Sequence, residues 1–142
     1  MAETRQSELA QPACCAAGES LVHEGLAPSG QKILVLLATD SLGQGDAELG
    51  RKIVSNFIKT MKEMGDDLWR LVLLNGGVKL AVEGSDALPQ LQELARGGLG
   101  ILVCGPCLKT FGLFEKRQVG ELTSMLDIIT SMQMAEKVIS LT

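Results

Sequence analysis

The tetrapeptide "CGPC" at positions 104–107 has the residues in this chain that are best suited to chemistry. Two thiols three positions apart can exchange disulfides, act as sulfur nucleophiles, or supply two ligands to a metal ion. Cys104 ends an apolar run, and Pro106 suits the first turn of a short helix that Gly112 would close. We therefore predict that Cys104 and Cys107 form a reactive pair where a strand passes into a helix.

The position of Cys104 also predicts its reactivity. The positive end of a helix dipole and the nearby Lys109 both stabilise a thiolate, so we expect the pKa of the Cys104 thiol to be lowered. On this basis Cys104 should react faster than Cys107 near neutral pH. Lys79 follows another apolar run and is a second candidate for lowering a thiol pKa.

Two other interpretations of the cysteine pair stay open. A structural zinc site needs four ligands, and the remaining candidates are Cys14, Cys15 and His23, which lie in an N-terminal segment of different composition. Adjacent cysteines are awkward co-ligands, so we expect no metal. The other interpretation is a pair of inert core cysteines, because free cysteine is often buried.

Alternating apolar and amphipathic segments indicate how the pair is positioned. Strands are predicted at 32–38, 68–74, 100–104 and 137–141, and helices at 47–64, 85–98, 107–112 and 119–133. Asp46 is expected to cap the first long helix and Gly65 to end it. The pattern predicts a single α/β domain over residues 31–142, built as a three-layer sandwich around a mainly parallel sheet.

The carboxyl ends of parallel strands meet at one edge of the sheet, where ligands usually bind. Three loops are predicted at that edge: residues 39–46, residues 75–79 and the loop that follows Cys104. We expect these loops to converge if their strands are neighbours. The candidate substrate-binding residues on them are Asp40, Ser41, Gly43, Asn75, Gly76, Lys79 and Gly105.

The glycine-rich loop at 39–46 does not match a nucleotide-binding motif. Its glycine spacing differs from the dinucleotide fingerprint, and Arg51 stands where a phosphate-binding loop has its lysine. Asp46 and Glu48 put two carboxylates at the place where a phosphate would bind. We expect residues 39–46 to form a tight turn that orients the following helix. We expect the protein to bind no cofactor.

Composition argues against several classes of protein. The chain has 142 residues, of which 46 % are hydrophobic, and a net charge of −4. Basic residues do not interleave with aromatic ones, which argues against nucleic-acid binding. No apolar run approaches the roughly 20 residues of a membrane span, and the first residues lack the apolar core of a secretory signal. We expect a cytoplasmic protein with reduced thiols and without a membrane partner.

The order of elements argues against a thioredoxin fold, although thioredoxins use the same tetrapeptide. A thioredoxin has its C-x-x-C early in the domain, and a β-hairpin follows later. Here the motif follows the third long apolar run, and one long helix and one strand come after it.

Four motifs together resemble the DsrE/DsrF-like family: "TDSLGQGDAELG" (39–50), "LLNGGVKLAVEGSDAL" (73–88), "CGPCLKTFGL" (104–113) and "VGELTSMLDI" (119–128). Over residues 31–142 the nearest likeness is to the C-terminal domain of YedF-type sulfurtransferase-like selenium-metabolism proteins. The resemblance implies a flavodoxin-like sandwich, assembly into oligomers, and a cysteine that holds sulfur or selenium as a persulfide. That cysteine is Cys104, eight residues before Gly112, and Cys107 is the second, resolving thiol.

The resemblance also implies partners. Proteins of this type begin with a TusA-like sulfur-carrier domain bearing C-P-x-P, which "QPACCAA" (11–17) does not match. We therefore expect a TusA-like carrier or another persulfide donor in trans, and a homo-oligomer. The alternatives are a non-catalytic oligomeric partner and a small-ligand binding module of the same pathway. We interpret residues 1–30 as a flexible tail, the alternative being an arm in which Cys14 or Cys15 relays sulfur to Cys104.

Overall fold

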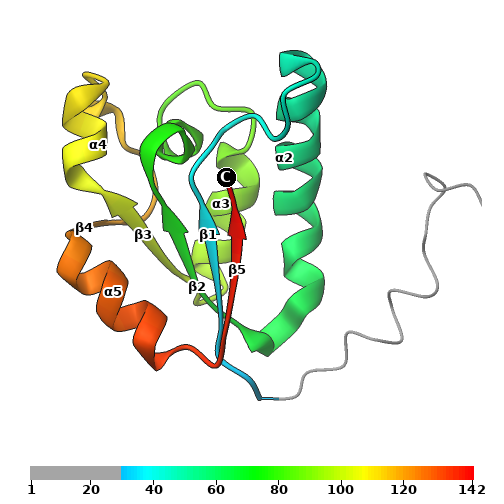
Figure 1. Cartoon of the computed structure of the whole chain (residues 1–142), viewed down its shortest axis with the longest axis vertical. Coiled ribbons are helices and arrows are strands. Elements are labelled where there is room, and N and C mark those ends of the chain that lie inside the picture. The colour runs from blue at the N-terminus through cyan, green and yellow to red at the C-terminus, as the bar shows by residue number, and fades with distance from the viewer. Residues whose placement is uncertain (1–29) are drawn as a thin grey trace, which may run out of the picture.

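The computed structural model describes residues 30–142, which form a five-stranded sheet with helices on both faces (Figure 1). The strands are β1 (Ile33–Leu37), β2 (Leu68–Leu73), β3 (Gly100–Cys104), β4 (Glu121–Thr123) and β5 (Lys137–Leu141). They lie in the order β4-β3-β2-β1-β5, and every neighbouring pair is parallel. The predicted single-domain α/β sandwich is confirmed. The predictions for Cys14, Cys15 and His23 fall outside the described range.

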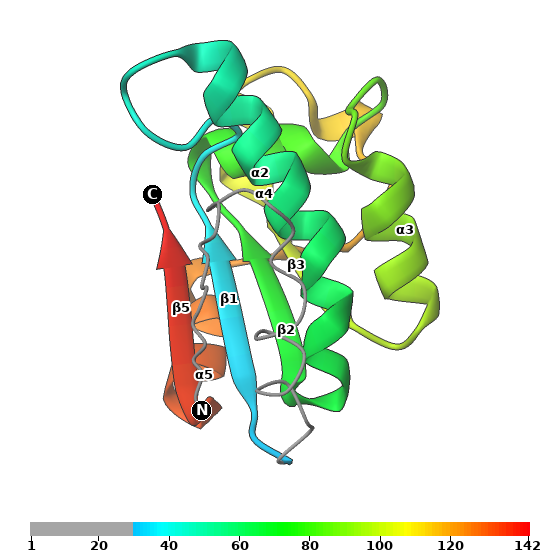
Figure 2. The same ribbon diagram turned by 90° about the vertical axis from the view of Figure 1, so that its right-hand side faces the viewer.

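The helices form two layers of unequal size. Helices α2 (Ala47–Met61) and α3 (Leu88–Arg96) cover one face of the sheet, and α5 (Met125–Met134) covers the other (Figure 2). Helix α4 (Gly105–Thr110) continues directly from β3 at the C-terminal edge of the sheet. The larger core cluster lies under α2 and α3, and the smaller one contains the buried residues Leu34, Leu36, Val72, Leu102 and Ile128.

Strand β1 shows why the strands of this sheet are unbroken runs of apolar residues and do not alternate between apolar and polar ones. All five of its residues are buried. Val35 and Leu37 point into the larger cluster, whereas Leu34 and Leu36 point into the smaller one. A parallel strand that is covered on both faces therefore needs apolar residues at every position.

Helix α2 begins where the sequence predicts and ends earlier. The Asp46 side chain accepts a hydrogen bond from the Leu49 N–H at 2.8 Å, so the predicted cap is confirmed. The α-helix stops at Met61 and passes into a 3-10 helix, η1 (Lys62–Asp67). Within η1, Gly65 adopts φ 60°, a conformation that glycine adopts at little cost.

Two other helix starts differ from the predictions. Helix α3 begins at Leu88, not at 85, because the Ser85 hydroxyl accepts the Ala87 N–H at 3.1 Å and holds a turn ahead of the helix. Helix α4 begins at Gly105, two residues before the predicted start at 107, and takes Pro106 into its first turn. Pro tolerates this position because its missing N–H would have no partner there.

The prediction of one helix over 119–133 is wrong at its N-terminal end. Residues 121–123 form the edge strand β4, which pairs with β3, so Leu122 belongs to a strand and not to a helix face. Helix α5 starts only at Met125, where Ser124 and Asp127 form a reciprocal capping box. A three-residue strand is too short to show a period of its own, so the helical spacing of apolar residues continues through it in the sequence.

The capping box of α5 predicts a pH-dependent loss of stability in Ser124→Ala. At neutral pH we expect a loss of about 1 kcal/mol, typical of a removed N-cap. The backbone N–H and the hydroxyl of Ser124 both donate to the Asp127 carboxylate and lower its pKa below its ordinary value, and the substitution removes only the contribution of the hydroxyl. That contribution is present above the unfolded pKa and is lost as the pH falls through the folded pKa. Urea unfolding of both proteins should therefore show a difference that shrinks below about pH 4, and a difference that grows in acid would contradict the assignment.

Candidate functional site

The two cysteines stand at the junction of β3 and α4. Cys104 is the last residue of β3 and the residue before α4, and it is only 6 % exposed. Cys107 lies in the first turn of α4 and is half-buried. Both are free thiols. The predicted position of the pair, at the C-terminal end of a buried strand, is confirmed.

The environment of Cys104 differs from the one that the sequence predicts. Burial raises the pKa of the Cys104 thiol, and the Cys107 side chain adds to the rise. A backbone N–H of Cys107 acts in the opposite direction but does not reverse the shift. The expectation of a lowered pKa is therefore wrong, because α4 has only six residues and desolvation outweighs the favourable end of so short a helix.

Cys107 contacts the loop that follows β2. The backbone N–H of Asn75 donates a hydrogen bond to the Cys107 Sγ at 3.3 Å. Asn75 has a positive φ of 45° and begins the 3-10 helix η2 (Asn75–Ala81). The predicted convergence of the 75–79 loop with the cysteine loop is confirmed by this contact.

The loop after β1 reaches the same edge through Asp40. A Cβ atom placed on Gly76 would lie 3.5 Å from Asp40 Oδ1, so this carboxylate lies against the first turn of η2. A Cβ atom on Gly77 would overlap the Leu37 carbonyl oxygen, so a side chain there would push η2 off the end of β1. Asp40 and Gly76 are therefore brought together.

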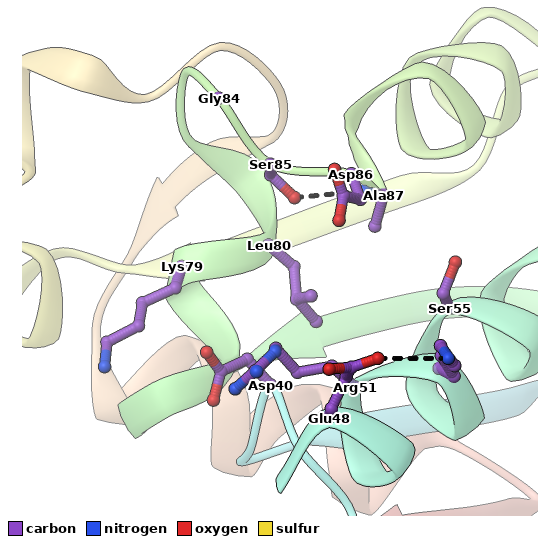
Figure 3. Close-up of a pocket in the computed structure, with 11 residues that line it drawn as sticks. Asp40, Glu48, Arg51, Ser55, Lys79, Leu80, Gly84, Ser85, Asp86 and Ala87 are labelled. Atoms are coloured by element: carbon purple, nitrogen blue, oxygen red, sulfur yellow. Dashed lines mark hydrogen bonds and ion pairs between the residues drawn. The ribbon is translucent and has the colours of Figure 1, made fainter.

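The two lysines predicted to lower a thiol pKa have other partners. Lys79 Nζ lies 4.7 Å from the centre of the Phe111 ring, and Lys109 Nζ lies 5.1 Å from that of Phe114. Neither is among the groups that shift the pKa of Cys104. Figure 3 shows Lys79 at one end of a cavity that also contains Asp40 and Arg51. Sequence reasoning missed Phe111, because nothing near it in the chain marks it, and it noted Arg51 only as a mismatch to a phosphate-binding loop.

The remaining predicted site residues shape the backbone. The Ser41 hydroxyl donates to the Ala47 carbonyl at 3.0 Å and so ties the loop to the start of α2. Gly43 is exposed with φ +90°, and no atom lies within 4 Å of a Cβ built there. Gly105 is buried at the start of α4, with the Thr123 carbonyl oxygen 3.8 Å from such a Cβ. No contact joins Ser41 or Gly43 to the cysteine sulfurs in the described part of the chain.

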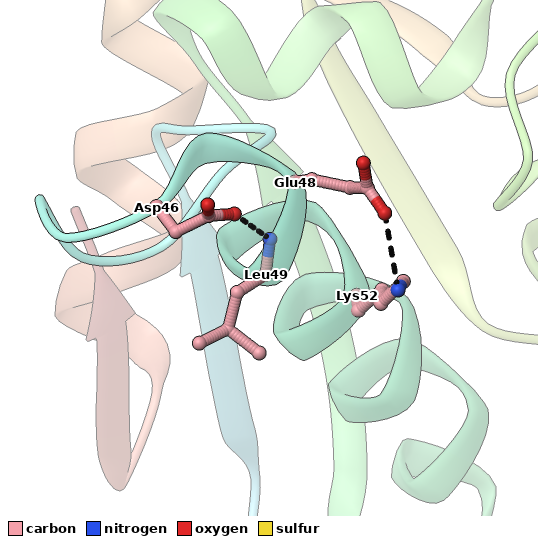
Figure 4. A network of polar contacts seen from close by, with 4 residues as sticks. All are labelled: Asp46, Glu48, Leu49 and Lys52. Atoms are coloured by element: carbon pink, nitrogen blue, oxygen red, sulfur yellow. Dashed lines mark hydrogen bonds and ion pairs between the residues drawn. The ribbon is translucent and has the colours of Figure 1, made fainter.

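The start of α2 is stabilised by the carboxylates that the sequence places there. Asp46 caps the helix, and Glu48 pairs with Lys52 at 3.1 Å on the exposed surface (Figure 4). Both acidic groups are thereby occupied in local contacts, as expected of a turn that aims a helix. Within residues 30–142, no three side chains of His, Cys, Asp or Glu gather so as to hold a metal ion.

The exposure of the two thiols predicts the order in which they react. Cys107 should be alkylated several-fold faster than Cys104 near neutral pH, the reverse of the expectation from sequence. Its sulfur is more accessible, while burial raises the Cys104 pKa and depletes the thiolate. Limited iodoacetamide labelling measures this, with fragment spectra to locate the label, because both thiols fall in one tryptic peptide. Equal rates, or faster labelling of Cys104, would contradict the structure.

Over the part of the chain that the structure describes, no helix is long and apolar enough to cross a membrane.

No curated protein matches the sequence. Solved structures that share the fold include three at low identity. YchN from E. coli is 17 % identical with a TM-score of 0.59, and the match covers 78 % of this chain and 99 % of that one.

Two further structures with this fold come from other organisms. MTH1491 from Methanobacterium thermoautotrophicum is 13 % identical with a TM-score of 0.61, over 78 % of this chain and 98 % of that one. BT1422 from Bacteroides thetaiotaomicron is 17 % identical with a TM-score of 0.53, over 78 % and 95 %. Because the model of the DsrE/DsrF-like family also matches residues 34–141, nearly the whole described domain, the chain belongs to the DsrE/DsrF-like family.

Proposed function

We propose that the Cys104–Cys107 pair transfers sulfane sulfur, or selenium in its place, and that the sulfur is held as a persulfide on Cys104. The family is related to sulfur relay. The observation that supports the proposal best is the placement of two free thiols at the C-terminal edge of the sheet, close enough for Cys107 to perturb the pKa of Cys104. The Asn75 N–H that points at Cys107 Sγ is suited to stabilising negative charge on that sulfur.

The unequal burial of the thiols orders the steps. The Cys107 thiolate attacks the outer sulfur of a donor persulfide, R–S–SH. A new S–S bond forms at Cys107, the S–S bond of the donor breaks, and R–S⁻ leaves. Cys104 gives its proton to the departing R–S⁻ and becomes a thiolate. The Cys104 thiolate then attacks the outer sulfur of Cys107–S–SH, which passes to Cys104 as Cys104–S–SH and leaves Cys107 as its thiolate. The burial of Cys104 then slows the loss of the persulfide sulfur to other thiols in solution.

Two routes discharge the persulfide. An acceptor thiolate that attacks the outer sulfur of Cys104–S–SH takes the sulfur and leaves the pair reduced. Alternatively the Cys107 thiolate attacks the inner sulfur, forms the Cys104–Cys107 disulfide and releases HS⁻. The second route is the resolving role of Cys107, and an external dithiol must then reduce the disulfide before another cycle.

We also propose the partners of this chemistry. The donor is a TusA-like carrier or another persulfide in trans, and the reaction takes place in the cytoplasm, where thiols stay reduced. The closer relationship to YedF-type proteins and the use of selenium belong to the same proposal. Whole-protein mass spectrometry after incubation with a persulfide donor tests it. We expect the mass to rise by one sulfur atom and to return to its first value when a thiol is added.

We further propose that the protein is a homo-oligomer assembled through the outer face of α5. Five apolar side chains on this helix are exposed, with Leu126 at 73 %, and the others are Met125, Ile129, Met132 and Met134. Asp127 is the single charged residue of the helix, and Ser124 holds its carboxylate in the capping box. A face that is apolar and nearly uncharged matches a second copy of itself, as a two-fold interface requires.

A further inference from the structure

A cavity of about 460 Å³ lies beside η2 at the C-terminal edge of the sheet (Figure 3). It is bounded by the first half of α2, by the end of η2 and by the turn that leads to α3. In the view of Figure 3, Lys79 stands at one end and Ser55 at the other, with Asp40 and Arg51 between them. Its volume is that of a small-molecule site.

The charges in this cavity are mixed and balanced. Glu48 and Lys52 pair with each other at 3.1 Å on the exposed rim. The other charged residues that line it are Arg51, Lys79, Asp40 and Asp86. Within residues 30–142, no hydrogen bond or ion pair satisfies these four side chains, and Lys79 stacks only on Phe111. Two positive and two negative side chains therefore border the cavity without an ion-pair partner in this part of the chain.

This balance selects the class of ligand. A phosphate or other anion that met Arg51 and Lys79 would also face the carboxylates of Asp40 and Asp86. A molecule with one carboxylate and one ammonium group can satisfy both signs at once. Leu80, which is 7 % exposed, and Ala87, which is 2 % exposed, add an apolar surface for a short side chain.

The cavity is connected to the cysteine pair through η2. The first residue of η2, Asn75, donates its N–H to Cys107 Sγ. Asp40 lies against the next residue, Gly76. Further along η2, the ammonium group of Lys79 lies over Phe111, the residue that ends α4. A ligand held by Asp40 and Lys79 is thus bound beside the segment that contacts Cys107.

We propose that this cavity binds a small zwitterionic thiol, either cysteine or a short peptide containing it, and that its persulfide form is the donor for Cys107. Arg51 and Lys79 would bind the carboxylate, and Asp40, which stands between them in Figure 3, the ammonium group. The inference rests on the proposed function. In the transfer step the Cys107 thiolate takes the outer sulfur, the donor S–S bond breaks, and the donor leaves as its thiolate. The proton stays on the transferred sulfur, so the step consumes no oxidant or reductant.

Binding is tested with a probe that cannot transfer sulfur. The full chain, labelled with ¹⁵N, is titrated with S-methylcysteine, and the amide shifts are followed. Two analogues that lack one charge serve as matched ligands: 3-(methylthio)propanoate and 2-(methylthio)ethylamine. We expect S-methylcysteine to bind at least about tenfold more tightly than either, because each lost charge removes a charge-assisted hydrogen bond. The largest shifts should fall on Arg51, Lys79 and Ser85.

Variants on α2 provide a paired control. Arg51→Gln should weaken the binding of S-methylcysteine about tenfold, whereas Lys59→Gln should leave it unchanged, since Lys59 lies in the last turn of α2, outside the cavity. Both side chains are exposed on the same helix, so neither change threatens the fold. Asp40→Asn should remove the advantage of S-methylcysteine over the carboxylate analogue. Equal binding of the three probes, or an Arg51→Gln protein that binds like the parent, would overturn the proposal.

Sulfur loading separates this inference from the function on which it rests. Inorganic polysulfide is a donor without the zwitterionic group. If it loads the cysteines while S-methylcysteine does not bind, the cavity proposal fails and the proposed function stands. If S-methylcysteine binds in the cavity but cysteine persulfide and polysulfide both leave the cysteines unloaded, the donor role and the proposed function fail together.

Discussion

Replacing both Cys104 and Cys107 with serine should abolish the gain of one sulfur atom after incubation with a persulfide donor. The two thiols are the only sulfur nucleophiles that the structure places at the C-terminal edge of the sheet within residues 30–142. The experiment is best performed in a Cys14→Ser/Cys15→Ser background, so that a mass gain reports on this pair alone. That background without further changes is the positive control, and we expect it to gain one sulfur atom.

The single variants distinguish the roles of the two thiols. Cys107→Ser should slow loading roughly tenfold or more, because the donor must then reach the buried thiol whose pKa is raised. Cys104→Ser should load at nearly the parental rate but lose its sulfur quickly to added thiol, because the persulfide stays on the exposed cysteine. A double variant that still gains sulfur would refute the site. Parental loading of Cys107→Ser would instead reverse the order of the two steps.

Loading should also rise with pH. Burial raises the pKa of Cys104, so its thiolate is scarce at neutral pH and becomes more abundant as the pH increases. In Cys107→Ser, where Cys104 must act alone, the loading rate should therefore climb more steeply above neutrality than in Cys104→Ser. Stopped reactions analysed by mass spectrometry at several pH values give both slopes.

The features of the fold that were predicted from sequence are those with a local signal. A buried parallel strand needs an unbroken apolar run, and "KILVLLA" shows one, so β1 was placed within a residue of each end. A helix cap depends on one side chain and the next few N–H groups, and Asp46 was identified for that reason. The convergence of the loops follows from the parallel order of the strands, and the Asn75–Cys107 contact confirms it.

The features that were missed depend on contacts between distant residues. Cys104 is buried because α4 folds back with Leu108 into the larger core, and no local pattern shows how far the sulfur is covered. Lys79 on η2 contacts Phe111 at the end of α4. The sequence predicts this lysine beside a thiol, but its ammonium group lies over an aromatic ring. Strand β4 exists because β3 offers it an edge to pair with, not because of its own three residues.

The exposed face of α5 predicts a large change in assembly. The parent protein should be a homo-oligomer at micromolar concentration, and Leu126→Asp should shift it to the monomer. Burying a leucine stabilises an interface by about 2 kcal/mol, and an unpaired carboxylate in the same place adds a desolvation cost. Together these effects should weaken association by at least roughly a hundredfold. Because Leu126 is 73 % exposed within one chain, the substitution should leave the monomer folded.

Light scattering coupled to size exclusion measures the assembly, and thermal unfolding checks the fold. Asn56→Asp is the matched control, since it adds the same charge at an exposed polar position on α2, on the opposite face of the sheet. It should keep the parental mass, whereas Ile129→Asp should behave like Leu126→Asp because it lies one turn away on the same apolar face. A monomeric parent would refute the assembly. An oligomer that survives both α5 substitutions would instead exclude α5 as its interface, leaving Leu126 and Ile129 exposed for a different partner.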